Sequence, residues 1–134
     1  MRDETRSWID RAEGDFEGAR LLSKSRSRNI THLVCFACQQ SAEKYLKAFL
    51  VENNVRFSKT HSLVRELLPA CESIDNEFKV LLPHLEVLDP YAVEFRYPGE
   101  TIPPSEKKQA FSASDKIRKF IRGKLGLERQ RRLL

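Results

Sequence analysis

At 134 residues, with 40% hydrophobic and 32% charged side chains, the chain has room for one domain and too many apolar residues to remain disordered. Its 24 lysines and arginines exceed its 19 acidic residues, and the net charge of +5 favours anionic partners. A surplus of this size does not by itself indicate nucleic-acid binding.

The first helical pattern runs from Trp8 to Leu22, with apolar residues recurring at helical spacing. The polar run from 23 to 31 predicts a turn after it. Four cations gather at this end of the helix: Arg20, Lys24, Arg26 and Arg28. They are either a solvated face, since the helix dipole favours cations near a C-terminus, or a phosphate-binding cluster.

A second helix is predicted over about residues 31 to 53, where apolar residues again recur at helical spacing. Because Leu33 and Phe36 lie off its main stripe, this helix is apolar on more than one side. Such a helix is either central in a bundle or shared with a partner chain. We therefore expect a homodimer with Leu33, Phe36 and Leu50 near its interface.

The cysteines Cys35, Cys38 and Cys71 are odd in number, and no secretory signal is recognisable, which favours free thiols in a reducing compartment, the cytoplasm. Cys35 and Cys38 have CxxC spacing but lie in an apolar helical run with no second pair for zinc, so we expect them to be packed in the core. The longest apolar stretch, Leu33 to Cys38, is too short to span a bilayer.

The next elements are short and rich in proline. Asn53 and Asn54 end the second helix, and a connection follows to residue 62. A third helix should stop at or near Pro69, and a fourth, including Leu82 in its apolar face, should be interrupted by Pro83.

Asp89 and Pro90 have the pattern of an N-cap followed by proline at the first helical position. They predict one or two helical turns from Tyr91 to Tyr97.

The last helix is predicted from Ser105 to the glycines at 123 and 126. It carries a second basic group, open to the same two interpretations: Lys116, Arg118, Lys119, Arg122 and Lys124. Because no alternating run of β-branched residues occurs, we expect an all-α fold, an up-and-down bundle of four to five helices over residues 1–127. Residues 128–134 are predicted to form a basic tail.

Four segments carry a family pattern in order along residues 5 to 125. The second helix has the string Phe-x-x-Gln-Gln-x-x-Glu-Lys-x-x-Lys-Ala beginning at Phe36. The others are the first helix around Trp8 and Asp15, the run Lys59-Thr60-His61-Ser62-Leu63, and the run Phe95-Arg96-Tyr97-Pro98-Gly99. Together they resemble the HEPN family.

The resemblance implies a helical bundle that commonly forms homodimers and acts with a minimal nucleotidyltransferase, often as a toxin–antitoxin pair. Many HEPN toxins are metal-independent ribonucleases with an Arg-x(4–6)-His motif, in which arginine stabilises charge on phosphorus and histidine moves a proton. Arg96 lies near the position of that arginine, but no histidine follows it. The pattern also occurs from Arg56 to His61 and from Arg26 to His32, in or beside connections between helices.

Polar residues of the second helix suggest the candidate site. Gln40 and Glu43 either hydrogen-bond across a bundle or dimer interface, or line a pocket where Arg96 pairs with a phosphate and Tyr97 stacks on a base. The predicted nucleotide- or RNA-binding residues are Gln40, Lys44, Lys47, His61, Arg96 and Tyr97. His61 has a structural alternative, as a cap of the third helix.

Neither a glycine-rich phosphate loop nor a metal-ligand spacing occurs, so no catalytic residue, metal or cofactor is predicted. We therefore expect a non-catalytic HEPN protein that binds nucleotide or RNA and acts with a nucleotidyltransferase. The alternatives are a metal-independent ribonuclease toxin and a plain dimerisation module.

Overall fold

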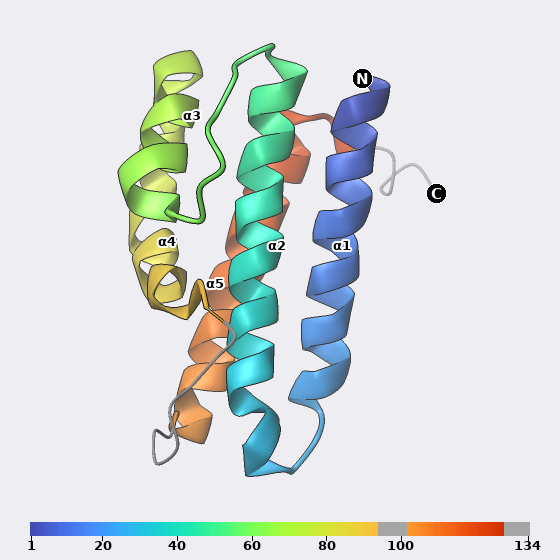
Figure 1. Ribbon diagram of the computed structural model, residues 1–134, viewed down its shortest axis with the longest axis vertical. Coiled ribbons are helices and arrows are strands. Elements are labelled where there is room, and N and C mark those ends of the chain that lie inside the picture. The colour runs from blue at the N-terminus through green and yellow to red at the C-terminus, as the bar shows by residue number, and fades with distance from the viewer. Residues whose placement is uncertain (94–101, 128–134) are drawn as a thin grey trace.

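The computed structural model describes residues 1–93 and 102–127 and contains five α-helices in that part of the chain. They are α1 (Asp3–Ser23), α2 (Thr31–Glu52), α3 (Leu68–Ile74), α4 (Leu82–Leu88) and α5 (Pro104–Lys124) (Figure 1). No strand occurs among the described residues, and the all-α prediction is confirmed. The predicted tail at 128–134 lies outside the described residues.

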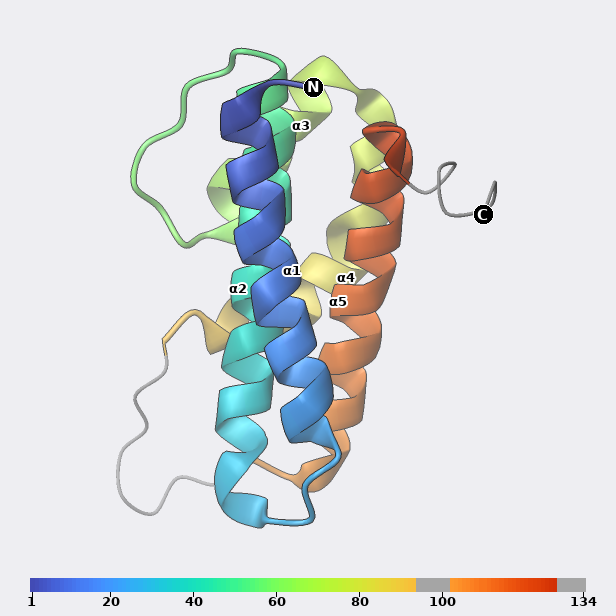
Figure 2. The same ribbon diagram turned by 90° about the vertical axis from the view of Figure 1, so that its right-hand side faces the viewer.

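The central element of the bundle is α2. The helices α1 and α5 pack along it, and α3 and α4 cover its remaining side (Figure 1, Figure 2). Tyr45, Leu46 and Ala48 are therefore all fully buried, although they lie on different sides of the helix. The central position explains within one chain why this helix is apolar on more than one side.

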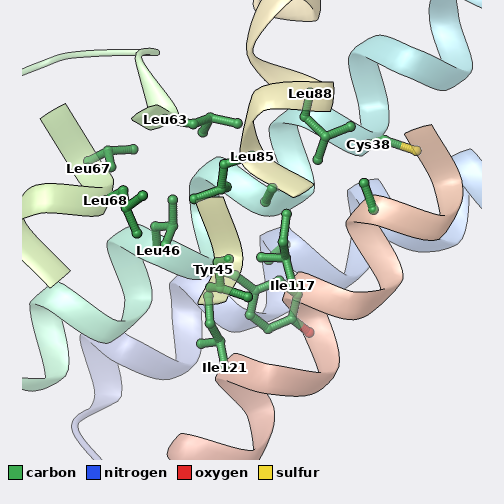
Figure 3. Packing of buried hydrophobic residues seen from close by; sticks show 14 of the residues in the cluster. Cys38, Tyr45, Leu46, Leu63, Leu67, Leu68, Leu85, Leu88, Ile117 and Ile121 are labelled. Atoms are coloured by element: carbon green, nitrogen blue, oxygen red, sulfur yellow. The ribbon is translucent and has the colours of Figure 1, made fainter. Parts of the chain in front are cut away.

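Figure 3 shows the part of the core where α2, α4 and α5 meet. Tyr45, Leu85, Ile117 and Ile121 are fully buried there. Each such aliphatic side chain contributes about 1.5–3 kcal/mol relative to an exposed position.

All three cysteines are buried, as predicted. Burial raises the pKa of the Cys38 and Cys71 thiols to about 12, so both remain protonated and pack as small apolar groups.

The two prolines predicted to end or interrupt helices instead begin them. Pro69 and Pro83 lie in the first turns of α3 and α4, where a missing N–H removes no intrahelical hydrogen bond. A π-helical turn, Leu63–Leu67, precedes α3, and a 3₁₀ turn, Asn76–Leu81, precedes α4. The prediction that Leu82 belongs to the core is also wrong, because this residue is 39% exposed.

Asp89 caps a different helical segment from the one predicted. Its carboxylate accepts hydrogen bonds from the backbone N–H groups of Leu63, at 2.9 Å, and Val64, at 3.4 Å. These are free donors at the start of the π-helical turn, so Asp89 joins the end of α4 to the beginning of that turn. A 3₁₀ turn, Asp89–Tyr91, follows α4, and Ala92 and Val93 are not helical.

Part of the basic group on α5 forms an internal link to α1. Glu13 accepts hydrogen bonds from Arg118 at 2.7 Å and Arg122 at 2.6 Å, and Arg122 also donates to the hydroxyl of Tyr45 at 3.3 Å. Burial alone would raise the pKa of Glu13, but the hydrogen bonds and charges of the two arginines outweigh it and hold the pKa below its usual value. These arginines are therefore structural.

The helix boundaries after α2 and α5 agree with the glycine and asparagine signals. Asn54 follows α2 with a φ of 58°, and Gly126 follows α5 with a φ of 78°. Both values are in the left-handed region that asparagine and glycine tolerate. Within residues 1–93 and 102–127, no helix is both long and apolar enough to cross a membrane.

Candidate functional site

A row of polar side chains is buried on one side of α2. Gln39 is fully buried, Glu43 is 3% exposed and Lys47 is 7% exposed. Spaced four residues apart, the three lie one above another on the same face of the helix. A charge at this depth requires partners, since burying an unpaired charge is costly.

Glu43 is the centre of the resulting network. Its Oε2 accepts from Nζ of Lys47 at 2.9 Å, while its Oε1 accepts from Nε2 of Gln39 at 3.3 Å and lies 2.9 Å from Nδ1 of His61. Nε2 of Gln39 also donates to the backbone carbonyl of His61 at 3.1 Å, and Gln40 donates to Oε1 of Gln39 at 2.7 Å. The network therefore ties the 53–62 connection to the middle of α2.

His61 combines a fixed orientation with exposure. Its side chain is 68% exposed, whereas that of Glu43 is only 4% exposed. A carboxylate can only accept hydrogen bonds, so the Nδ1 facing it is the nitrogen that donates a proton to Glu43. Nε2 is then left with a lone pair that can take up a proton, or with a proton that can be donated to an anion.

Two aromatic rings flank Lys47. Its Nζ lies 5.6 Å from the ring centroid of Trp8 and 5.5 Å from that of Phe57, and the two rings pack edge to face with centroids 6.0 Å apart. The ammonium is therefore held between an ion pair with Glu43 and the faces of aromatic rings. Lys47 stabilises the network and has little surface left for a ligand.

A cleft of about 470 Å³ lies beside this aromatic pair. Its lining residues are Arg2, Glu4, Trp8, Val51, Asn54, Val55, Arg56 and Phe57. Arg56 is exposed, and no salt bridge is formed by its side chain among the described residues. Lys47 connects the cleft to His61, because it touches the aromatic lining on one side and Glu43 on the other.

The predicted binding residues fall into three groups. Gln40, Lys47 and His61 belong to the network around Glu43. Lys44 does not, because it pairs with Asp15 of α1. Arg96 and Tyr97 lie outside the described residues.

His61 does not cap the following turn. The hydroxyl of Ser62 does so by accepting from the N–H of Arg65 at 3.3 Å.

The predicted interface residues also differ from one another. Leu33 and Phe36 are half-buried and present some surface, but Leu50 is fully buried within the single chain. Leu50 therefore has no surface to offer a second copy.

Sequence reasoning missed Trp8 and Phe57 as partners of Lys47. Trp8 is expected from the sequence as part of the apolar stripe and of the family pattern of the first helix. The one available signal for Phe57 is that it is a lone aromatic residue in a polar connection. Among the described residues, no group of histidine, cysteine and acidic side chains is arranged to hold a metal ion.

The sequence matches the family model described as the HEPN domain over residues 5–126. Two solved structures have a similar fold. The archaeal HEPN homologue ST0689 has a TM-score of 0.69 and 22% identity, with 92% of this chain and 98% of that chain covered. TT1696 from Thermus thermophilus has a TM-score of 0.68 and 22% identity, with 92% and 99% covered. A search of curated proteins gave no match.

The network predicts that Glu43→Gln lowers the free energy of unfolding by about 3 kcal/mol, because it leaves the buried ammonium of Lys47 without its counter-ion. Urea unfolding followed by circular dichroism measures the loss. Lys44→Gln is the matched control, since it breaks a more exposed ion pair on the same helix and should cost less than about 1 kcal/mol. Equal losses in the two variants would contradict the central role of Glu43.

Proposed function

Because this chain belongs to the HEPN domain family, we propose that it is a non-catalytic member that binds a nucleotide or RNA near His61 and acts with a nucleotidyltransferase partner. The observation that carries the proposal is the exposed His61 ring, oriented by the buried carboxylate of Glu43, which Lys47 links to a cleft with aromatic and arginine side chains. The toxin–antitoxin role and the partner are drawn from the family resemblance.

The chemistry around the cleft suits a phosphate-bearing aromatic ligand. Arg56 supplies a guanidinium, which pairs with phosphate oxygens in a bidentate manner. Trp8 and Phe57 supply aromatic surface against which a base can pack. Protonated His61 would add a further donor to an anion. On the basis of the sequence, Arg96 is also proposed to pair with a phosphate and Tyr97 to stack on a base.

The proposal assigns a binding role because the sequence lacks the family's ribonuclease motif after Arg96. The pattern from Arg56 to His61 lies in a non-helical part of the chain, residues 55–62, so helical geometry does not bring these two side chains together. A reacting phosphate needs both groups at once, one for charge and one for proton transfer.

A ribonuclease is the second candidate function, and the pairing of His61 with Glu43 is the observation that favours it. A carboxylate on one ring nitrogen orients the imidazole and leaves the other nitrogen for proton transfer, as a general base requires. A plain dimerisation module is the remaining alternative, and failure to bind any nucleotide or RNA would support it.

The first expected outcome concerns binding. His61→Ala and Arg56→Gln should each weaken binding of a fluorescent ATP analogue or a single-stranded RNA about tenfold, since a hydrogen bond to a charged group contributes about 1.5–3 kcal/mol. Fluorescence anisotropy measures the affinity, which should fall as salt rises. Arg96→Ala tests the sequence-based part of the site in the same way.

Arg6→Gln is the matched control for that binding assay. It removes one exposed charge from α1 without touching the cleft lining. If this variant weakens binding as much as Arg56→Gln, net charge rather than a site governs the affinity. Unchanged binding in both His61→Ala and Arg56→Gln would show that the ligand does not bind on this face.

The second expected outcome is that the purified protein does not cleave RNA in the absence of metal. Electrophoresis of a labelled RNA after incubation with the protein provides the measurement, with His61→Ala and Arg96→Ala run alongside. Cleavage abolished by both substitutions would establish the ribonuclease and overturn the binding role. Cleavage that survives both would indicate a contaminating nuclease.

The third expected outcome is a homodimer that uses Leu33 and Phe36, the half-buried apolar residues of α2. Light scattering should give twice the chain mass of 15.6 kDa, and Phe36→Glu should shift the mass toward the monomer. A monomeric wild type would contradict this assembly.

The proposed partner is tested by sequencing the gene next to the one that encodes this chain. The proposal expects that gene to encode a minimal nucleotidyltransferase.

A further inference from the structure

A second groove, of about 350 Å³, lies between α4 and α5. The connection that carries His61 lies on the opposite side of α2 from α5 (Figure 1, Figure 2). The groove is lined by His84, Val87, Lys108, Gln109, Ser112, Ala113 and Lys116. No carboxylate is among them, so the charged lining has a single sign.

The two lysines of this groove differ from four other cations of α5, which form salt bridges. Arg118 and Arg122 pair with Glu13, Lys119 pairs with Asp115 at 3.0 Å, and Lys124 pairs with Asp75 at 2.7 Å. Within residues 1–93 and 102–127, neither Lys108 nor Lys116 forms a salt bridge. The positive charge of the groove is therefore not neutralised by neighbours in that part of the chain.

His84 of α4 lies in the same groove and is affected by the charge of Lys116. Partial burial, together with the nearby charge of Lys116, lowers the pKa of His84 below its usual value. Burial is the larger of the two causes, and the smaller one shows that the charge of Lys116 acts on the His84 ring across the groove. A groove of one charge sign with low-dielectric walls concentrates ions of the opposite sign.

The spacing of the donors determines which anion fits. Lys108, Ser112 and Lys116 follow one another at intervals of four residues and share one face of α5. A rise of 1.5 Å per residue separates the two lysines by about 12 Å along the helix axis. This spacing exceeds the width of a single phosphate, and a chain of linked phosphates can follow the groove past both lysines.

We propose that the groove between α4 and α5 is a second binding site, which holds a linear chain of linked phosphates between Lys108 and Lys116. Gln109 and Ser112 provide neutral donors between the two charges, and Val87 and Ala113 provide the apolar wall. The backbone of single-stranded RNA and inorganic polyphosphate share this chemistry. The site does not depend on His61 or on the proposed function around it.

The test uses the full chain with two probes, a fluorescent oligouridine and inorganic polyphosphate as its competitor. Affinity is measured by anisotropy over a range of salt concentrations, in the wild type and in Lys108→Gln/Lys116→Gln. Each phosphate contact on a single strand contributes about 0.7 to the slope of log affinity against log salt, so the double variant should lose about 1.4. The control pair Arg6→Gln/Arg11→Gln removes the same charge from exposed positions of α1 and should change the slope far less.

The groove variant is combined with His61→Ala to separate the two sites. An equal loss of slope with or without His61→Ala supports an independent groove. The proposal is overturned if the control pair lowers the slope as much as the groove pair, or if the groove pair leaves it unchanged. Poly-glutamate that displaces oligouridine as well as polyphosphate does would also overturn it, since the groove would then bind acidic polymers in general.

Discussion

Glu43 places a carboxylate almost completely inside the protein, and several features of the structure follow from the need to compensate that charge. Lys47, one turn further along α2, supplies the counter-ion, and Gln39, one turn earlier, supplies an amide donor. The third partner comes from the 53–62 connection, through His61. Because His61 contacts Glu43 through its ring and Gln39 through its backbone carbonyl, this arrangement fixes a connection of ten residues that has no regular secondary structure of its own. The orientation of His61, and with it the candidate site, is a consequence of that constraint.

The same principle governs where positive charge is available on the surface. The chain has a net charge of +5, but much of the basic character of α5 is matched by acids from other parts of the fold. Glu13 of α1 forms salt bridges with two arginines of α5, and Lys124 forms salt bridges with Asp75 and Glu77. On α2, Lys44 is matched by Asp15 and Lys47 by Glu43. Basic residues that look alike in the sequence thus divide into those that hold helices together and those, such as Arg56 and Lys116, that have no such partner in the described residues.

The central position of α2 separates the two surfaces on which our proposals rest. One face of this helix carries the buried polar row and the connection with His61, and α5 packs on the other side and forms the second groove with α4 (Figure 2). Fifteen of the 22 residues of α2 are buried, and a shift of this helix would disturb both surfaces. Buried side chains packed at crystalline density favour a rigid frame for both.

The sequence by itself determined the all-α fold, the limits of α2 and α5 to within one or two residues, the burial of the cysteines and the family. Helical periodicity and local capping signals contain that information, because they depend on residues a few positions apart. Three features depended on the tertiary structure. Pro69 and Pro83 begin helices, each just after a π-helical or 3₁₀ turn. Asp89 caps a segment 26 residues away from it, and Lys44 of α2 is matched by Asp15 of α1. Hydrogen bonds and ion pairs between distant residues leave no periodic trace in a sequence, so only the folded chain decides which charges are matched and which remain for a ligand.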